Sequence, residues 1–211
     1  METILFLTHP EDDGSLGRSA LETLTGVVEL NRQLSDAKFV AGFIGDDVST
    51  AVAEASGCGA KTFYTVSGPD FKMSRCASDT AALEAICRAS GATIVVAPTT
   101  SRFNRAIPGV AQRLDGRIDT HVGGFTVNGA ELRIQRGYYR QRMIASLTRT
   151  ARPWFLTFDS GVFPKWEGAP VAVQTETLNV KIGDELRKTN VTGYKAPLAS
   201  VQTIRPDAKL L

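Results

Sequence analysis

Arginine and tyrosine side chains are concentrated in one stretch of this sequence. Six arginines, at positions 133, 136, 140, 142, 149 and 152, lie around Tyr138 and Tyr139. If the stretch is extended, one face carries Arg136, Tyr138, Arg140 and Arg142. Guanidinium groups beside aromatic rings suit a phosphate, a carboxylate-rich protein surface or a stacked base. Three interpretations remain open: a solvated strand face paired with acidic neighbours, a protein interface, or a nucleotide or nucleic-acid site.

Two histidines and one acidic loop are the other residues whose types could do chemistry. His9 follows the first apolar run, and neither His9 nor His121 has the sequence context of a hydrolytic triad. Glu11, Asp12 and Asp13 could bind magnesium. A solvated loop that complements the amino end of the following helix is the simpler interpretation. We therefore expect no catalytic residue and no metal site.

Glycine-rich phosphate loops and nucleophile elbows are missing from the sequence. It contains no G-x-x-x-x-G-K-[ST], no G-x-G-x-x-G after an apolar run and no G-x-S-x-G. The absence of these motifs counts against a small hydrolase or synthetase and against a free-standing nucleotide-binding module. Cys58, Cys76 and Cys87 have neither zinc nor C-x-x-C spacing, so we expect reduced thiols.

Composition is that of an ordinary globular protein. Of the 211 residues, 43% are apolar and 22% are charged, and the net charge is +2. This charge is too small to indicate nucleic-acid binding by itself. No apolar run reaches the roughly 20 residues of a membrane helix, and the amino terminus lacks the basic flank of a signal peptide. We expect a cytoplasmic protein without membrane insertion.

Apolar runs and helical spacing alternate in the first half of the chain. Buried strands are expected at residues 4–8, 39–44, 62–66 and 93–97. Helices are expected after the first acidic loop, with Ser15 as the N-cap, and at 50–55, 78–89 and 107–114. This alternation predicts an α/β fold with a mainly parallel sheet and helices on both faces.

After Gly116 the pattern changes to antiparallel strands. Residues 120–127 and 132–135 flank Asn128-Gly129, which is a strong hairpin-turn signal. Strands are expected to continue at 143–147 and 154–158, with an edge strand at 174–180. We expect one domain over residues 1–167. Residues 168–211 are expected to form the edge strand and a carboxyl-terminal extension or truncated linker. Residues 204–211 have the character of such a linker.

Several short motifs occur in order between residues 3 and 163. They are the acidic-Gly-Ser-Leu loop at 12–16, the strand 94–97 with Pro98-Thr99-Thr100-Ser101 and 108–114, Asp119 to Val122, Arg136 to Tyr139, and Arg152-Pro153 with Thr157 and Gly161-Val162-Phe163. In this order and spacing the motifs resemble the amino-terminal domain of electron-transfer flavoprotein alpha subunits.

The resemblance implies an adenine-nucleotide-hydrolase-like α/β fold, a beta-subunit partner and FAD in the assembled complex. In that family a separate carboxyl-terminal domain, with a Ser-Gly-Gly-Arg-Gly loop, carries most flavin contacts, and this sequence contains no such loop. We therefore expect a scaffold and docking domain in FAD-mediated electron transfer, with the flavin on the partner or on a separate flavin domain. The chain alone is expected to retain no FAD and to be an electron-carrier subunit rather than a catalyst. The alternative is a free-standing adenine-nucleotide-binding module of the same superfold.

Two segments depart from the pattern of the family. Phe103-Asn104-Arg105 stands where the family has Gly-Arg-Asp, and Tyr139-Arg140-Gln141 stands where it has Tyr-Gly-Gly. The second change replaces glycines by bulky polar side chains, which alters what can approach the backbone. We predict that the four-residue arginine–tyrosine face forms the docking surface for the partner.

Overall fold

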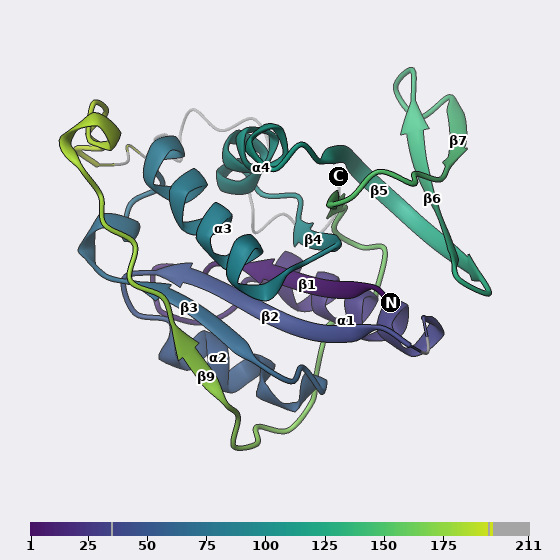
Figure 1. Ribbon diagram of the computed structural model, residues 1–211, viewed down its shortest axis with the longest axis horizontal. Coiled ribbons are helices and arrows are strands. Elements are labelled where there is room, and N and C mark those ends of the chain that lie inside the picture. The colour runs from purple at the N-terminus through teal and green to yellow at the C-terminus, as the bar shows by residue number, and fades with distance from the viewer. Residues whose placement is uncertain (35, 194, 196–211) are drawn as a thin grey trace, which may run out of the picture.

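A single mixed sheet organises the computed structural model, which describes residues 1–34, 36–193 and 195. Over these residues the sheet has nine strands in the order β7-β6-β5-β8-β4-β1-β2-β3-β9 (Figure 1). The strands are β1 (Thr3–Thr8), β2 (Lys38–Gly45), β3 (Phe63–Ser67), β4 (Ile94–Pro98), β5 (Arg117–Asn128), β6 (Glu131–Tyr138), β7 (Met143–Leu147), β8 (Trp154–Phe158) and β9 (Thr175–Thr177). The helices are α1 (Arg18–Gln33), α2 (Ser49–Ala55), α3 (Cys76–Ser90) and α4 (Ser101–Arg113).

The centre of the sheet is parallel, as the alternation of strands and helices predicts. β1 pairs in parallel with β2 on one side and β4 on the other, and β3 continues the parallel pairing from β2. Ile94, Val95 and Val96 in β4 are fully buried because helices cover both faces of this part of the sheet. The predicted α/β fold is therefore confirmed.

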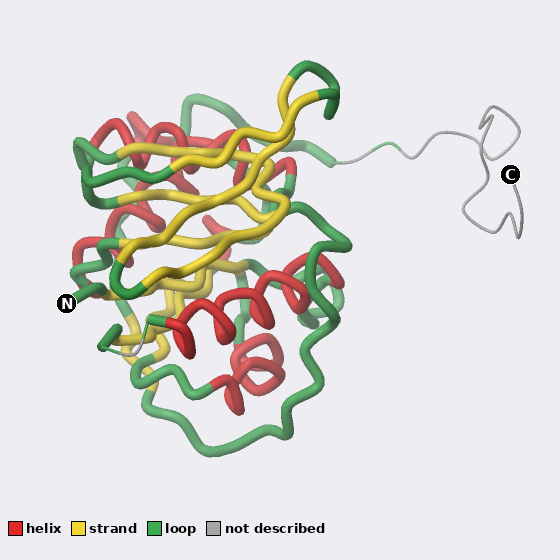
Figure 2. The backbone as a smooth tube through the Cα atoms, turned by 90° about the vertical axis from the view of Figure 1, so that its right-hand side faces the viewer, coloured by secondary structure: helices red, strands yellow, loops and turns green. Residues whose placement is uncertain are grey.

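The second half of the chain extends the same sheet (Figure 2). β5, β6 and β7 pair antiparallel, and the turn between β5 and β6 contains Gly129 at φ 60°. A two-residue hairpin turn of this kind requires positive φ, which glycine adopts without strain. β8 inserts between β4 and β5 and is parallel to both. The antiparallel section thus continues the sheet that the first half begins.

Two hydrophobic layers lie on opposite faces of the sheet. Leu24, Val27 and Leu30 of α1 pack on one face together with α2. α3 and α4 cover the other face, through residues such as Ile86 and Phe103 (Figure 1). Burial of each large apolar side chain contributes about 1.5–3 kcal/mol, so these layers hold the sheet in place.

Two helix starts differ from the sequence prediction. α4 begins at Ser101 rather than at residue 107, because the Thr100 hydroxyl accepts a hydrogen bond from the Phe103 backbone N–H at 3.3 Å. The expected Ser15 cap is wrong: α1 begins at Arg18, after Gly17. The Ser15 hydroxyl instead donates to Asp13 at 2.6 Å, which holds the preceding loop.

The segment after β8 wraps around the β3 edge of the sheet. Its β9 pairs in parallel with β3 and lies within the expected edge strand at 174–180, but it is shorter than that range. Leu178, Val180 and Ile182 then pack on the α3 and α4 face. The expected boundary at residue 167 stays a prediction, and residues 204–211 of the expected extension lie outside the described residues. Among the helices described, none has the length and apolar character needed to cross a membrane.

Candidate functional site

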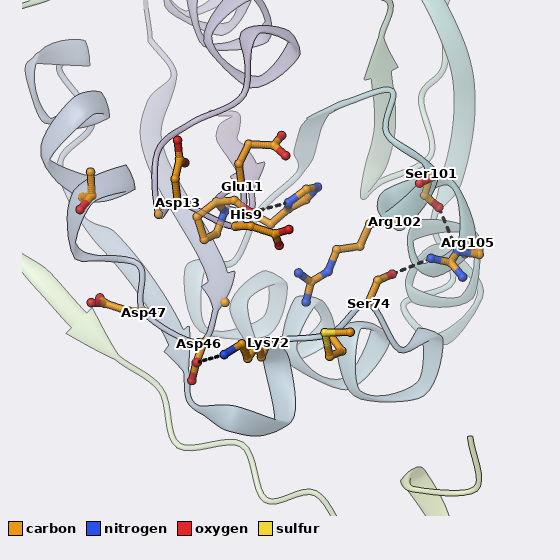
Figure 3. Close-up of a pocket in the computed structure, with 16 residues that line it drawn as sticks. His9, Glu11, Asp13, Asp46, Asp47, Lys72, Ser74, Ser101, Arg102 and Arg105 are labelled. Carbon is orange, nitrogen blue, oxygen red and sulfur yellow. Dashed lines mark hydrogen bonds and ion pairs between the residues drawn. The ribbon is translucent and has the colours of Figure 1, made fainter. Parts of the chain in front are cut away.

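A cavity of about 780 Å³ opens at the carboxyl ends of the central parallel strands (Figure 3). His9 follows β1, Asp46 follows β2, and Ser101 begins the helix after β4. β1 has β2 as its neighbour on one side and β4 on the other, so the chain direction around the sheet reverses here. Ligands of open α/β sheets bind at such a reversal point.

A buried ion pair supports one wall of this sheet-end cavity. Arg102 on α4 donates to both carboxylate oxygens of Asp79 on α3, at 2.9 and 2.6 Å. Its guanidinium also donates to the Phe71 carbonyl at 2.7 Å. The Asp79 side chain is 1% exposed and that of Arg102 is 9% exposed. This bidentate pair fixes the α3–α4 contact, and it leaves Arg102 neutralised before any ligand arrives.

His9 lies beside this pair with both ring nitrogens engaged. Nδ1 lies 3.0 Å from the Pro10 carbonyl, so it carries the proton and donates. Nε2 lies 3.3 Å from the Thr100 hydroxyl, and the ring packs edge-on against Phe103. Burial lowers the pKa of His9, the Pro10 carbonyl opposes this shift, and the charge of Arg102 adds to it. The imidazole is therefore neutral at pH 7 and positions the loop.

Carboxylates dominate the rest of the lining. They belong to Glu11, Asp12, Asp13, Asp46 and Asp47, so five acidic side chains face three cationic ones in the cavity. Backbone and hydroxyl groups hold two of the acids: Asp13 accepts from Ser15, and Asp47 accepts from the Ser49 N–H at 2.9 Å.

The cationic side chains are already engaged. Lys72 lies 3.7 Å from Asp46, and Arg105 donates to the Ser74 hydroxyl at 2.6 Å (Figure 3). Within the described part of the chain, no group of three His, Cys, Asp or Glu side chains is arranged to hold a metal ion. The sheet-end cavity is therefore lined by polar side chains, most of which already have partners within the chain.

The arginine–tyrosine region surrounds a second buried carboxylate, that of Asp119 on β5. Asp119 is 1% exposed and accepts from the Arg149 guanidinium, with one bond of 2.8 Å, and from the Trp154 indole at 2.8 Å. Arg136 on β6 approaches the same carboxylate at 3.5 Å and lies over the Tyr138 ring at 4.7 Å. Burial raises the pKa of Asp119, but its hydrogen bonds from Arg149 and Trp154 outweigh burial and lower it.

The four residues of the predicted face do not follow one continuous strand. Arg136 and Tyr138 lie on β6 and share a face, but the chain turns immediately afterwards. Tyr139, Arg140 and Gln141 have φ values of 49°, 57° and 64°, so the turn is left-handed. Arg140 therefore projects from the turn, and Arg142 precedes β7. The four residues would share one face only if residues 136–142 were extended. They are not, because a hairpin turn reverses the chain after Tyr138.

The domain family follows from sequence comparison. Residues 4–183 match the family described as the electron transfer flavoprotein domain. The chain belongs to this family. No curated protein matches the sequence.

Membership in the electron transfer flavoprotein domain family brings an association with FAD, which the sheet-end cavity does not fit. Five carboxylates and only three cationic side chains line the cavity, and this acidic excess repels a diphosphate. Asp79 already neutralises Arg102 and Asp46 pairs with Lys72, so Arg105 is the one cationic side chain of the described lining without a carboxylate partner. We therefore assign no flavin contact to this cavity.

Sequence reasoning missed the charged residues that organise both regions of this electron transfer flavoprotein domain. Neither Asp79 nor Arg102 was singled out from the sequence, and Asp119 was named only as the first residue of the motif Asp119 to Val122. One signal was available: Asp79 lies on the otherwise alanine-rich stripe of the third expected helix, where a carboxylate needs a partner. The motif Asp119 to Val122 marks the position of Asp119, but it does not indicate that the carboxylate is buried.

Proposed function

We propose that this chain acts as an alpha-type subunit of an electron transfer flavoprotein, as the scaffold and docking domain of a complex with a beta-type subunit. FAD would be held by the partner or by a separate flavin domain, and this chain would be an electron-carrier subunit rather than a catalyst. The observation that carries the proposal is the family match over residues 4–183. The alpha-type motifs between residues 3 and 163 support the choice of subunit.

The end of the β6–β7 hairpin supports a docking role. Tyr139, Met143 and Ile144 are 76%, 58% and 75% exposed, which is unusual for large apolar side chains placed so close together. Arg140 and Arg142 lie beside them, and neither forms an ion pair with another described residue. Tyrosine, methionine and arginine are enriched at protein interfaces. This group of side chains therefore has the composition of an interface.

The backbone of the hairpin adds a second argument. β7 is the outermost strand of the sheet, so one of its edges has no strand partner among the described residues (Figure 1). An exposed strand edge with apolar side chains offers a template for pairing with another chain. Arg136 and Tyr138 lie behind this edge, with Arg136 anchored on Asp119, and they give the surface a fixed shape.

Co-expression with a beta-type subunit tests the proposal. The complex should co-purify and show the visible absorption of a flavin, whereas the chain alone should be colourless after gel filtration. The double variant Arg140→Ala with Arg142→Ala should weaken the complex by about 2 kcal/mol, or roughly thirtyfold. The matched control is Arg133→Ala, which removes an exposed arginine of the same hairpin that already pairs with Glu131.

Unchanged complex formation in the double variant would refute the docking surface. Two results would refute the proposal that this chain docks a partner and that the flavin is held elsewhere. One is the failure to form any complex with a beta-type subunit, and the other is a stoichiometric flavin on the chain alone. Thermal unfolding of each variant alone separates lost docking from lost folding.

A free-standing adenine-nucleotide-binding module is the second candidate. The location of the sheet-end cavity at the reversal point of strand order favours it, because nucleotides bind there in other open α/β sheets. The five carboxylates of the cavity oppose a phosphate group. Calorimetric titration of the isolated chain with AMP distinguishes the two: saturable binding without complex formation favours this candidate.

A further inference from the structure

A second cavity, of about 510 Å³, lies beneath the β6–β7 hairpin. Its walls come from β5, from β6, the following turn and the start of β7, and from the loop that follows β8. The polar side chains at this hairpin cavity are His121, Gln135, Arg136, Arg140, Gln141, Asp159 and Ser160. None of them lines the sheet-end cavity, so the two cavities are separate.

The charges around the hairpin cavity do not cancel. Asp119 is one carboxylate, but both Arg149 and Arg136 approach it, so this group of three carries a surplus positive charge. Arg140 adds a second positive charge, since it forms no ion pair within the described structure. Asp159 is the counter-charge in the lining, and His121 already engages it through Nδ1 at 2.9 Å. The cavity therefore has an excess of positive charge that favours an anion.

Hydrogen-bond donors at the cavity lack acceptors. The Nε of Arg136 is buried and has no hydrogen-bond partner among the described residues. An unpaired buried donor of this kind costs free energy unless a ligand or water supplies an acceptor. The Arg140 guanidinium offers further donors in a fork that matches phosphate and carboxylate oxygens. Both arginines line the same cavity.

The backbone around the cavity is held in uncommon conformations. His121, Arg140 and Gln141 have φ values of 57°, 57° and 64°, in the left-handed region that non-glycine residues rarely adopt. All three line the hairpin cavity. Backbone strain of this kind concentrates at ligand sites, where it orients side chains. Here it directs one residue of β5 and two of the turn into a common space.

Glycines leave the floor of the cavity open. A Cβ atom added at Gly123 would meet nothing within 4 Å, so the bare backbone there is accessible. A Cβ at Gly137 would lie 3.3 Å from the Gln141 side chain, so glycine lets the turn fold back over β6. A small ligand can thus rest against the sheet, under the turn.

We propose that the hairpin cavity binds a small oxyanion, namely the phosphate or carboxylate group of a small molecule, through the guanidinium groups of Arg140 and Arg136. The isolated chain should bind the oxyanion by itself, so this proposal does not depend on docking to a beta-type subunit. Arg140 contributes to both, whereas Arg142 lies outside the cavity lining. This difference makes the two proposals separable.

Titration of the isolated, ¹⁵N-labelled full chain tests the proposal. The probes are inorganic phosphate and malonate, each compared with potassium chloride at matched ionic strength. The amide signals of Gly123 and Gly137 should shift saturably with at least one of the two anions. Comparison of the phosphate and malonate titrations then identifies which oxyanion the cavity prefers.

Two variants decide whether the cavity is responsible. Arg140→Gly, which also relieves the left-handed turn, should weaken binding at least about tenfold, or about 1.4 kcal/mol. The matched control Arg142→Ala should bind within about twofold of the unmodified chain, or about 0.4 kcal/mol. The proposal is overturned if neither anion exceeds the chloride effect, if Arg140→Gly binds normally, or if Arg142→Ala loses as much affinity as Arg140→Gly.

Discussion

Replacing Asp119 by alanine should destabilise the folded protein by about 3 kcal/mol. The carboxylate is the common acceptor of three donors from separate strands and loops: Arg136, Arg149 and the Trp154 indole. Alanine removes all three interactions at once and leaves the donors in place. The change therefore tests whether this buried acceptor holds the antiparallel section against β8.

The magnitude follows from the burial of each donor. Trp154 is fully buried, so its indole N–H would lose the one acceptor that it has among the described residues, at a cost of about 1–3 kcal/mol. Breaking a fully buried ion pair costs about 3–5 kcal/mol, but the Arg149 side chain is 36% exposed and can regain water. Arg136 is 20% exposed and recovers less. Together these effects give a loss of about 3 kcal/mol rather than about 5.

Urea unfolding followed by tryptophan fluorescence measures this loss. Asp119→Asn keeps one acceptor oxygen and should lose about half as much free energy as Asp119→Ala. Glu131→Gln is the matched control, because it breaks an exposed pair with Arg133 on the same hairpin and should change stability by no more than about 0.5 kcal/mol. A loss for Asp119→Ala as small as that of the control would refute the reasoning.

The pH dependence gives an independent check on Asp119. Its pKa is lower in the folded protein than in the unfolded chain, so the unfolded state binds the proton first on acidification. The contribution of Asp119 is therefore fully present above the unfolded pKa of about 3.9 and is lost as the pH falls through the lower folded value. The stability of Asp119→Ala should fall less steeply than that of the unmodified protein in this acidic range.

Three further predictions concern the core and the sheet-end cavity. Asp79→Ala leaves Arg102 buried without a counter-ion and should cost about 3–5 kcal/mol in urea unfolding, whereas Asp79→Leu with Arg102→Met should recover most of the loss. Gly26→Ala should cost about 1–3 kcal/mol, because its Cβ would lie 2.6 Å from a phenylalanine ring. Gly109→Ala should stabilise α4 by up to about 1 kcal/mol, because the nearest atom to its Cβ would be 3.5 Å away. Calorimetric melting measures both variants, and shifts of the melting temperature in the same direction would contradict this prediction. The lowered pKa of His9 means that the unfolded chain binds this proton first, so the contribution of His9 is lost as the pH falls below about 6.5, and His9→Gln should flatten the stability profile between about pH 7 and about pH 5. Identical profiles would show that His9 titrates normally.

The sequence by itself determined the elements that depend on local patterns. The buried strand at residues 94–97 was recognisable because an apolar run of this length fits a sheet covered on both faces. The end of α3 was recognisable because a glycine, Gly91, follows the helical pattern. Glycine readily adopts the positive φ of a helix end, which is 62° here. The turn at Asn128-Gly129 was recognisable for the same reason. Each of these signals involves residues that lie close together in the chain.

Helix starts were less accessible to sequence reasoning, even though they are local. α4 begins at Ser101 because Thr100 accepts the Phe103 N–H, yet the apolar spacing becomes clear only from residue 107 onward. Ser15 has the right residue type for an N-cap, but Asp13 takes its hydroxyl. The helix begins only at Arg18, after Gly17, so residue type alone does not place the cap.

Only the tertiary structure decided where the charges meet. Asp119 and Arg149 are 30 residues apart, and Asp79 and Arg102 are 23 apart, so no local spacing links them. They meet because β8 inserts between β4 and β5 and because α3 packs on α4. The two cavities depend on the same placements, since their walls come from strand ends and loops distant in the chain. Ion pairs and hydrogen bonds act over a few ångströms, so they exist only after burial of the apolar faces has brought these segments together.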